Sequence, residues 1–259
     1  MNQLTVLGGS AAGVGTGQGC SSYLIQSDET TIVLDMGPNT LLELRKHTNY
    51  RTLDGIVISH LHLDHLLDLF ALRFMLSYNP VKAEKKIPLH LPPGGLAFLE
   101  KAADLFATDD DDVAAYFSAV FEMSEYDPEA MLPIADIEIR FAPTIHIIPC
   151  WAIRVQPKGS DALLFTADTG TDSDLTSIAA GAAVIVADSA SGPDAPEKAK
   201  QTIHYDAVAA AQLAETAGCQ HLVLSHQWEE NDPVRNAAIA REHYQGRISI
   251  ATPGLTVTW

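Results

Sequence analysis

The chain has 259 residues, of which 47% are hydrophobic, enough for a sizeable packed core. Its formal net charge is −17, from 16 basic and 33 acidic residues. Extended nucleic acid is therefore not an expected partner, because such binding relies on cations that neutralise phosphates. Since no apolar run reaches about 18 residues, no membrane span is expected either.

Short apolar runs in the first part of the chain predict strands joined by short turns, which indicates an antiparallel or mixed sheet. The predicted strands are 4–7, 22–26, 31–35 and 55–59, and helices are predicted over 41–47 and 66–78. The region around 92–128 looks helical and variable, and we expect it either to form a lid over a cleft or to cover one face of the sheet. Its run of four aspartates, 109–112, is interpreted as a solvated helix start, where carboxylates are favourable.

The second half alternates strands with helices. Strands are predicted at 137–141, 151–156, 162–167, 183–187, 222–225, 247–251 and 255–259, and helices at 173–180, 205–217 and 233–244. Two sheets with helices on their outer faces accommodate both halves of the chain. The pattern therefore predicts an α/β fold in one domain that spans residues 1–259.

Two further features bear on the class of protein. The glycine-rich stretch 8–19 leads into a predicted strand, whereas a dinucleotide-binding loop leads into a helix, so we interpret it as a structural loop. Three scattered cysteines, Cys20, Cys150 and Cys219, are interpreted as core thiols. Their odd number, and an N-terminus without the pattern of a signal peptide, favour a reducing, cytoplasmic setting.

The stretch 59–65 carries the most specific signal, because it places three imidazoles and one carboxylate directly after a predicted strand. These residues follow the pattern H-x-H-x-D-H: His60, His62, Asp64 and His65. Imidazole and carboxylate are the ligand types of Zn²⁺ and related ions. Four of them on one loop exceed one metal's share if a position stays open for substrate. The motif therefore indicates two adjacent metals.

Three later residues share this context of a polar ligand type at the end of a predicted strand: His146, Asp168 and His226. Each signal is weak alone, since a single histidine is more often a surface or satisfied core residue. Together with the H-x-H-x-D-H motif, their order resembles that of the metallo-β-lactamase superfamily of hydrolases. The segment 166–170, Thr-Ala-Asp-Thr-Gly, resembles the turn that bears that family's aspartate.

The resemblance implies a four-layer αβ/βα sandwich and a role for each ligand. It implies a first metal bound by His60, His62 and His146, a second bound by Asp64, His65 and His226, and Asp168 as the bridge. It also implies that Asp35 accepts an N–H from a metal-bound histidine, with a strand-end turn residue as the alternative. His62 stands where oxygen-reducing diiron relatives typically carry Glu, which favours hydrolysis at zinc, with manganese as the alternative. Asp168 makes antibiotic hydrolysis unexpected, because β-lactam-hydrolysing members generally lack that bridge.

His204 bears on the choice of substrate. It opens a predicted helix, and the region 204–226 resembles the phosphodiesterase branch that includes ribonuclease Z. The resemblance implies that His204 is a proton donor, with a surface or capping residue as the alternative. The helix N-terminus is expected to lower its pKa. His146 and Asp168 are only 22 positions apart, which leaves no room for the tRNA-gripping arm of ribonuclease Z.

We therefore predict a dinuclear metal-dependent hydrolase, with His204 and Asp64 as catalytic residues. The favoured substrate is a small anionic phosphodiester, a cyclic nucleotide or short oligonucleotide. The alternatives are a thioester or lactone hydrolase of the glyoxalase II or lactonase kind, a tRNA 3′-processing endoribonuclease, and a metal-binding module without activity. A homodimer is compatible with the resemblance.

Overall fold

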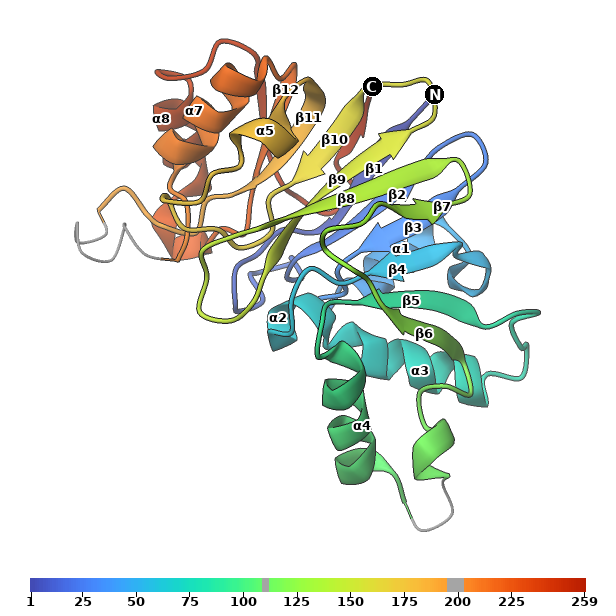
Figure 1. Cartoon of the computed structure of the whole chain (residues 1–259). Coiled ribbons are helices and arrows are strands. Elements are labelled where there is room, and N and C mark those ends of the chain that lie inside the picture. The colour runs from blue at the N-terminus through green and yellow to red at the C-terminus, as the bar shows by residue number, and fades with distance from the viewer. Residues whose placement is uncertain (109–111, 195–202) are drawn as a thin grey trace.

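The computed structural model describes residues 1–108, 112–194 and 203–259, and it contains two seven-stranded sheets packed face to face (Figure 1). The first sheet has the order β14 (Thr256–Thr258), β1 (Gln3–Gly8), β2 (Ser22–Gln26), β3 (Thr31–Leu34), β4 (Gly55–Val57), β5 (Ile87–Leu91) and β6 (Phe121–Glu125). The second has the order β13 (Arg247–Ile250), β12 (His221–Ser225), β11 (Ala182–Asp188), β10 (Ala162–Phe165), β9 (Trp151–Pro157), β8 (Ile137–Pro143) and β7 (Leu132–Ile134).

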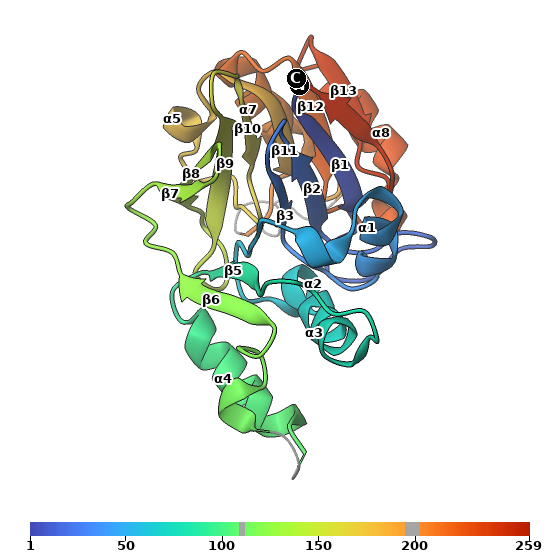
Figure 2. The ribbon, with the colours of Figure 1, turned by 90° about the vertical axis from the view of Figure 1, so that its right-hand side faces the viewer.

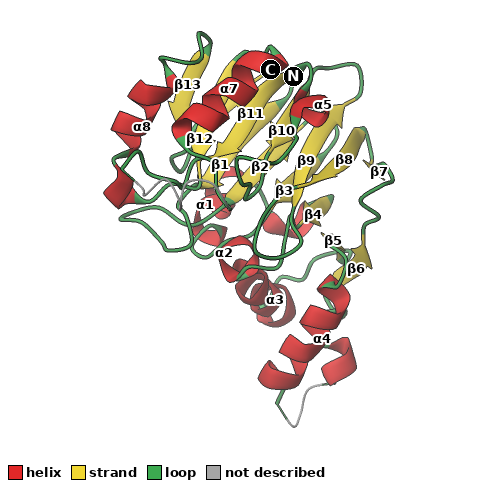
Figure 3. Ribbon diagram, turned by 60° about the vertical axis from the view of Figure 1, so that its left-hand side comes forward, coloured by secondary structure: helices red, strands yellow, loops and turns green. Residues whose placement is uncertain are grey.

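Helices cover the outer face of each sheet, which gives four layers. The helices beside the first sheet are α1 (Leu41–His47), α2 (Leu63–Leu66), α3 (Asp68–Tyr78) and α4 (Gly95–Phe106). Those beside the second are α5 (Thr176–Ala179), α7 (Ala207–Ala217) and α8 (Pro233–Ala240), and Figure 3 shows α7 lying across its strands. Within the described residues, 3₁₀ turns lie at Tyr50–Thr52, Val113–Ala115 and Glu229–Asn231. The predicted αβ/βα sandwich is confirmed.

Three apolar cores hold these layers together. The central core lies between the sheets and includes Tyr23, Val57 and Val186. One outer core packs α1, α3 and α4 on the first sheet, and the other packs α5, α7 and α8 on the second. The parallel strands β10, β11 and β12 are buried along their whole length except at His221, because helices cover one of their faces and the first sheet covers the other.

The sequence predictions were wrong in places where a short strand or a helix end lacks a clear pattern. The strands β5, β6 and β7 were not predicted, and β6 lies inside the region 92–128 that was expected to be helical. The predicted helix 66–78 corresponds to α3, which begins at Asp68, while residues 63–66 form the separate short helix α2. Helix α8 ends at Ala240, four residues before the predicted end. Within the aspartate run, residues 109–111 lie outside the described residues, and Asp112 caps a 3₁₀ turn by accepting the N–H of Ala114.

The strand directions bring several loops to one edge of the molecule. β3 to β6 are mutually parallel, and so are β10 to β13, so the carboxyl ends of neighbouring strands in each run meet at the same edge. The loops after β4, β10, β11 and β12 therefore approach one another. Helix α4 extends away from the body of the two sheets (Figure 2). In the part of the chain that the structure describes, no helix is both long and apolar enough to cross a membrane.

Candidate metal centre

The H-x-H-x-D-H loop leaves the end of β4 and turns at once into α2, with His62 as the N-cap residue. This local turn gives His60, His62, Asp64 and His65 different directions within six residues. Asp35, fully buried at the end of β3, fixes the loop from below. It accepts the backbone N–H and the hydroxyl of Ser59, each at 2.7 Å, and its Oδ2 lies 2.7 Å from Nδ1 of His65. The His65 Nε2 atom therefore points away from Asp35 and into the site.

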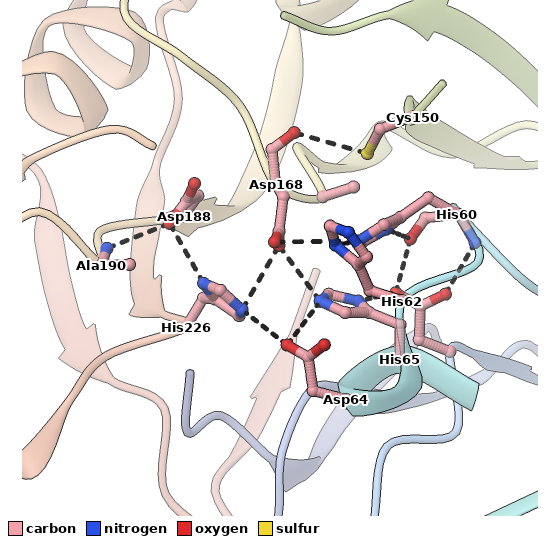
Figure 4. A network of polar contacts seen from close by, with 12 residues as sticks. His60, His62, Asp64, His65, Cys150, Asp168, Asp188, Ala190 and His226 are labelled. Carbon is pink, nitrogen blue, oxygen red and sulfur yellow. Dashed lines mark hydrogen bonds and ion pairs between the residues drawn. The ribbon is translucent and has the colours of Figure 1, made fainter. Parts of the chain in front are cut away.

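A first group of donor atoms gathers His60, His62, His146 and Asp168. His62 Nδ1 lies 3.1 Å from His60 Nε2 and 3.0 Å from His146 Nε2. Asp168 Oδ2 lies 3.8 Å from His60 Nε2 and 3.5 Å from His146 Nε2. The loop after β8 supplies His146 and the loop after β10 supplies Asp168, and both meet the loop after β4. Figure 4 shows Asp168 pointing toward the histidines of that loop.

A second group gathers Asp64, His65, His226 and again Asp168. Asp168 Oδ1 lies 3.1 Å from His65 Nε2 and 3.4 Å from His226 Nε2. Asp64 Oδ2 lies 3.4 and 3.3 Å from the same two nitrogens. Each group thus receives one oxygen of the Asp168 carboxylate, which lies between them.

The spacing of these atoms fits a metal ion better than it fits hydrogen bonds. Ligands about 2.0–2.1 Å from a tetrahedral metal such as zinc lie about 3.3 Å from one another, close to the distances seen in both groups. His65 Nε2 and Asp168 Oδ1 are buried and only 3.1 Å apart, yet neither has a hydrogen-bond partner among the described residues. A cation between them would satisfy both atoms.

The electrostatics of the site also call for a cation. Although burial opposes it, the pKa of Asp64 lies well below its ordinary value because His226 and His65 contact the carboxylate. The same two histidines hold the pKa of buried Asp168 well below its usual range. Burial disfavours a charged imidazole, but Asp168 and its neighbours raise the pKa of His226 to about 10. The carboxylates of the site are therefore ionised, and their buried negative charge needs a compensating positive charge, which a bound metal would supply.

His204 lies beside both groups, and Asp188, which the sequence analysis missed, holds it there. The His204 ring centroid is 5.2 Å from that of His146 and 5.1 Å from that of His226. Asp188 is buried at the end of β11, where one oxygen lies 2.9 Å from His204 Nδ1 and the other lies 3.5 Å from His226 Nδ1. The signal that found Asp168 and His226, a polar residue at a strand end, would also have found Asp188.

Two predictions about His204 were wrong. Helix α7 begins at Ala207, with Asp206 as its N-cap, so His204 lies before the helix and does not open it. Its pKa is raised and not lowered: burial disfavours the charged ring, but the Asp188 carboxylate stabilises it more strongly. The side chain of His204 is 21% exposed, whereas that of Asp188 is fully buried, so of these two residues only His204 is accessible from solvent.

Backbone strain is concentrated around the site. Asp35, Ala167 and His226 have positive φ angles of 57°, 51° and 54°, a region that L-residues seldom adopt. The surrounding contacts hold them there. For example, the carbonyl of Asp168 accepts hydrogen bonds from Thr144 Oγ1 at 2.7 Å and from Cys150 Sγ at 3.4 Å. Strain of this kind persists where the fold over-determines a functional position.

Comparison with known proteins shows the family to which the chain belongs. A family model described as Anti-Pycsar protein Apyc1 matches residues 2–215, most of the chain. The chain belongs to this family. The metallo-β-lactamase resemblance is likewise confirmed by its relatives.

Three similar proteins illustrate the range of names among the relatives. The Bacillus subtilis protein named "probable metallo-hydrolase YhfI" is 24% identical over 97% of this chain and 98% of its own. Its crystal structure superposes with a TM-score of 0.86 at 22% identity, covering 99% of this chain and 98% of that one. Ribonuclease Z of Myxococcus xanthus is 24% identical, covering 98% of this chain and 97% of the relative. A diphosphatase of the PhnP family has a TM-score of 0.73 at 22% identity, covering 100% and 98% of the two chains.

These observations establish the chain as a metal-dependent hydrolase with a metallo-β-lactamase fold. The family membership, the fold and the clustered imidazole and carboxylate groups agree. Between His146 and Asp168 the chain forms only β9 and β10, so no protruding arm is inserted there.

Proposed function

We propose that this hydrolase is a dinuclear phosphodiesterase that cleaves small phosphodiesters, such as a cyclic nucleotide or a short oligonucleotide. One cation would be held by His60, His62 and His146, and the other by Asp64, His65 and His226, with Asp168 between them. The ions would be zinc, with manganese as the alternative, since nitrogen and oxygen ligands suit both. When bound, they would activate water for attack on phosphorus and neutralise charge on the phosphoryl oxygens.

The observation that carries the proposal is the position of His204. Phosphodiester cleavage expels an alkoxide, which leaves much faster when a group on the protein protonates it. His204 lies next to His146 and His226, is partly exposed, and is oriented through Nδ1 by the Asp188 carboxylate. Its Nε2 is therefore the atom that would donate the proton. Asp64, whose side chain is 11% exposed, would orient the attacking water with its second oxygen.

Similar proteins support phosphoester chemistry. Among the relatives, one is named ribonuclease Z and another a diphosphatase, and both names describe cleavage at phosphorus. A thioester hydrolase would use the same metal ligands, but its thiolate leaving group needs no proton donor and would not explain a histidine held by a buried carboxylate. A lactone hydrolase also expels an alkoxide, so assays with both substrates separate it from a phosphodiesterase. The three cysteines are buried and unpaired, which supports a reducing compartment, and we infer a cytoplasmic protein.

The test is His204→Ala in metal-loaded protein. We expect unchanged metal content and a loss of about 10²–10⁴-fold in kcat for bis(p-nitrophenyl) phosphate and cyclic nucleotides, the usual contribution of a positioned proton donor. His243→Ala, which removes an exposed histidine on the surface, serves as the matched control and should have no effect. Full phosphodiester turnover in His204→Ala, or hydrolysis by the wild type of a thioester but no phosphodiester, would contradict the proposal.

A further inference from the structure

The lysines and arginines of this acidic chain are unevenly distributed over its surface. Six of the 16 line two cavities, of about 450 and 430 Å³: Arg45, Lys46, Arg51, Lys82, Lys85 and Lys86. The cavities are neighbours, because Arg51 Nε in the wall of one donates a hydrogen bond at 3.0 Å to the carbonyl of Val81, which directly precedes Lys82 in the wall of the other. Such a concentration of positive charge in a chain of net charge −17 indicates a local role.

Both cavities lie at the opposite end of the first sheet from the metal centre. The turn Tyr50–Thr52 comes shortly before β4, and Lys86 comes directly before β5, whereas His60 follows β4. Since β4 and β5 are parallel, their amino ends meet at one edge of the sheet and the metal centre lies at the other. In Figure 1, the loop that leads into β5 and helix α2 lie at opposite ends of these strands. A ligand in either cavity would therefore be bound away from the metal centre.

The larger cavity, which we call the basic pocket, is formed by residues 45–51 at the C-terminal end of α1. Part of its charge has a structural explanation, because cations offset the negative end of a helix dipole. Lys46 Nζ and His47 Nε2 lie 2.5 and 2.9 Å from the carboxylate of Glu43. Arg45 is exposed, and its guanidinium has no acceptor among the described residues. Helix stabilisation therefore accounts for the charge of this turn, but it leaves the hydrogen-bonding groups of Arg45 free.

A second guanidinium of the basic pocket, that of Arg51, is held in place. Its Nε donates to the Val81 carbonyl, and its Cζ lies 4.3 Å from the centroid of the Tyr50 ring. Tyr50 is only 3% exposed, so this ring provides a fixed surface. The two terminal nitrogens of Arg51 have no acceptor in the part of the chain that the structure describes. A guanidinium that is fixed in this way is preorganised to bind a phosphate through two N–H groups.

The remaining lining of the basic pocket also offers hydrogen-bond donors. Thr48 supplies a hydroxyl, and the side-chain oxygen of Asn49 accepts the N–H of Arg51 at 3.2 Å, which leaves the Asn49 amide nitrogen as a donor. None of the described residues that line the pocket carries a carboxylate. The end of α1 contributes about half a negative charge, which the three cations Arg45, Lys46 and Arg51 exceed. The pocket therefore suits an anion.

We propose that the basic pocket binds the phosphate group of a phosphorylated small molecule, at a site separate from the metal centre. Two arginines favour phosphate over a single carboxylate, because a phosphate monoester offers more acceptor oxygens and carries about −1.5 to −2 charge near neutral pH. The volume of about 450 Å³ is typical of small-molecule pockets and leaves room for an organic group beside the phosphate. The site does not depend on what the metal centre hydrolyses, so it stands or fails separately from the proposed function.

Chemical footprinting of the metal-loaded protein locates the ligand without any substitution. Phenylglyoxal modifies accessible guanidinium groups, and mass spectrometry measures the rate of modification at each arginine. Inorganic phosphate should slow the modification of Arg45 and Arg51, whereas Arg140, an exposed arginine on β8, should react at an unchanged rate. Chloride at the same ionic strength is the reference, because salt screens exposed charges in general.

Isothermal titration calorimetry with inorganic phosphate then measures the affinity. Arg45→Gln combined with Arg51→Gln should weaken binding to this pocket by about 10- to 100-fold, the usual range for hydrogen bonds to charged groups. Phosphate bound at the metal centre would form a separate binding event that this variant keeps. Arg140→Gln combined with Lys158→Gln removes two exposed positive charges from the second sheet and should bind phosphate as the wild type does. Unchanged affinity in the first variant, or equal protection of Arg140 and the two pocket arginines in the footprint, would refute the site.

Discussion

The two halves of the molecule contribute to the metal centre in different ways. The first half supplies His60, His62, Asp64 and His65 from one loop of six residues, anchored from below by Asp35. The second half supplies single residues from separate segments. His146, Asp168, Asp188 and His226 lie at or just after the ends of four strands, and His204 lies shortly before α7. The first set is positioned by one turn of chain. The second depends on the register and order of the strands β8 to β12.

The two halves therefore have different roles in the site. A local loop can place several ligands, but it cannot surround a cation from all sides. The distributed residues close the site from the opposite sheet, and Asp168 reaches both donor groups from a single position. Substitutions in the second half should therefore separate metal binding from proton donation, while the first half is left intact.

The largest effect is expected for Asp168→Asn. Loss of the carboxylate removes an anionic oxygen from each group, so the two proposed metal ions should bind more weakly. We expect kcat/KM to fall by about 10³-fold or more, since metal ions contribute several kcal/mol of transition-state charge stabilisation. Elemental analysis after dialysis should show less metal than in the wild type.

Thermal unfolding gives a second measurement on the same variant. A metal that binds only the folded state stabilises it, so a chelator should lower Tm of the wild type more than that of Asp168→Asn. Asp172→Asn changes an exposed aspartate a few residues further along the chain and should behave as wild type. A variant that kept full metal content would show that the first-half loop suffices.

A smaller effect is expected for Asp188→Asn, which leaves every residue of the two metal groups in place. Removing the residue that orients His204 and His226 should lower kcat by about 10- to 100-fold, as is typical of groups that orient ligands. Asp188 raises the pKa of His204, so its loss should lower that pKa. A general acid must be protonated, and the decline of kcat at high pH should therefore begin at a lower pH than in the wild type.

A double-mutant cycle shows whether Asp188 acts through His204 or through His226. If Asp188 acts through His204, Asp188→Asn should cost less in a His204→Ala background than alone, because coupled residues are not additive. Full additivity, with no displacement of the pH profile, would assign Asp188 to His226 and the metal instead.

The same contrast explains how much the sequence predicted. The H-x-H-x-D-H loop is visible because its spacing alone is informative, and the buried strands β8 to β12 follow from their apolar runs. The strands β5 to β7, of which β6 and β7 are edge strands, carry weaker patterns, with Pro88 inside β5 and Pro133 inside β7, so they were missed. Asp188 also stands at the end of a predicted strand, but its role depends on two partners, 16 and 38 positions later, that only the fold brings together. The predicted direction of the pKa shift of His204 was wrong for the same reason, since burial lowers this pKa but the Asp188 carboxylate, which only the fold brings close, raises it more strongly.

The smallest expected effect concerns Tyr126, which directly follows β6 of the first sheet and contacts the H-x-H-x-D-H loop. The Tyr126 hydroxyl donates to the carbonyls of Ile58 and Ser59, at 3.0 and 3.3 Å, just before His60. Its ring stacks on Phe141 with centroids 3.9 Å apart, so Tyr126→Phe should keep the packing and lose only these hydrogen bonds. We expect a loss of about 1–2 kcal/mol in the free energy of unfolding, because two buried carbonyls lose their donor.

Tyr50→Phe is the matched control, because the Tyr50 hydroxyl is also buried but has no hydrogen-bond partner among the described residues. Its removal should be neutral or slightly stabilising. For a chain of this size, 1 kcal/mol corresponds to about 2–4 °C in Tm, so thermal unfolding resolves the two variants. Since Asp35 also holds the loop, kcat of Tyr126→Phe should change little. Equal Tm values for the two variants would mean that Asp35 and the helix α2 position the loop without help from Tyr126.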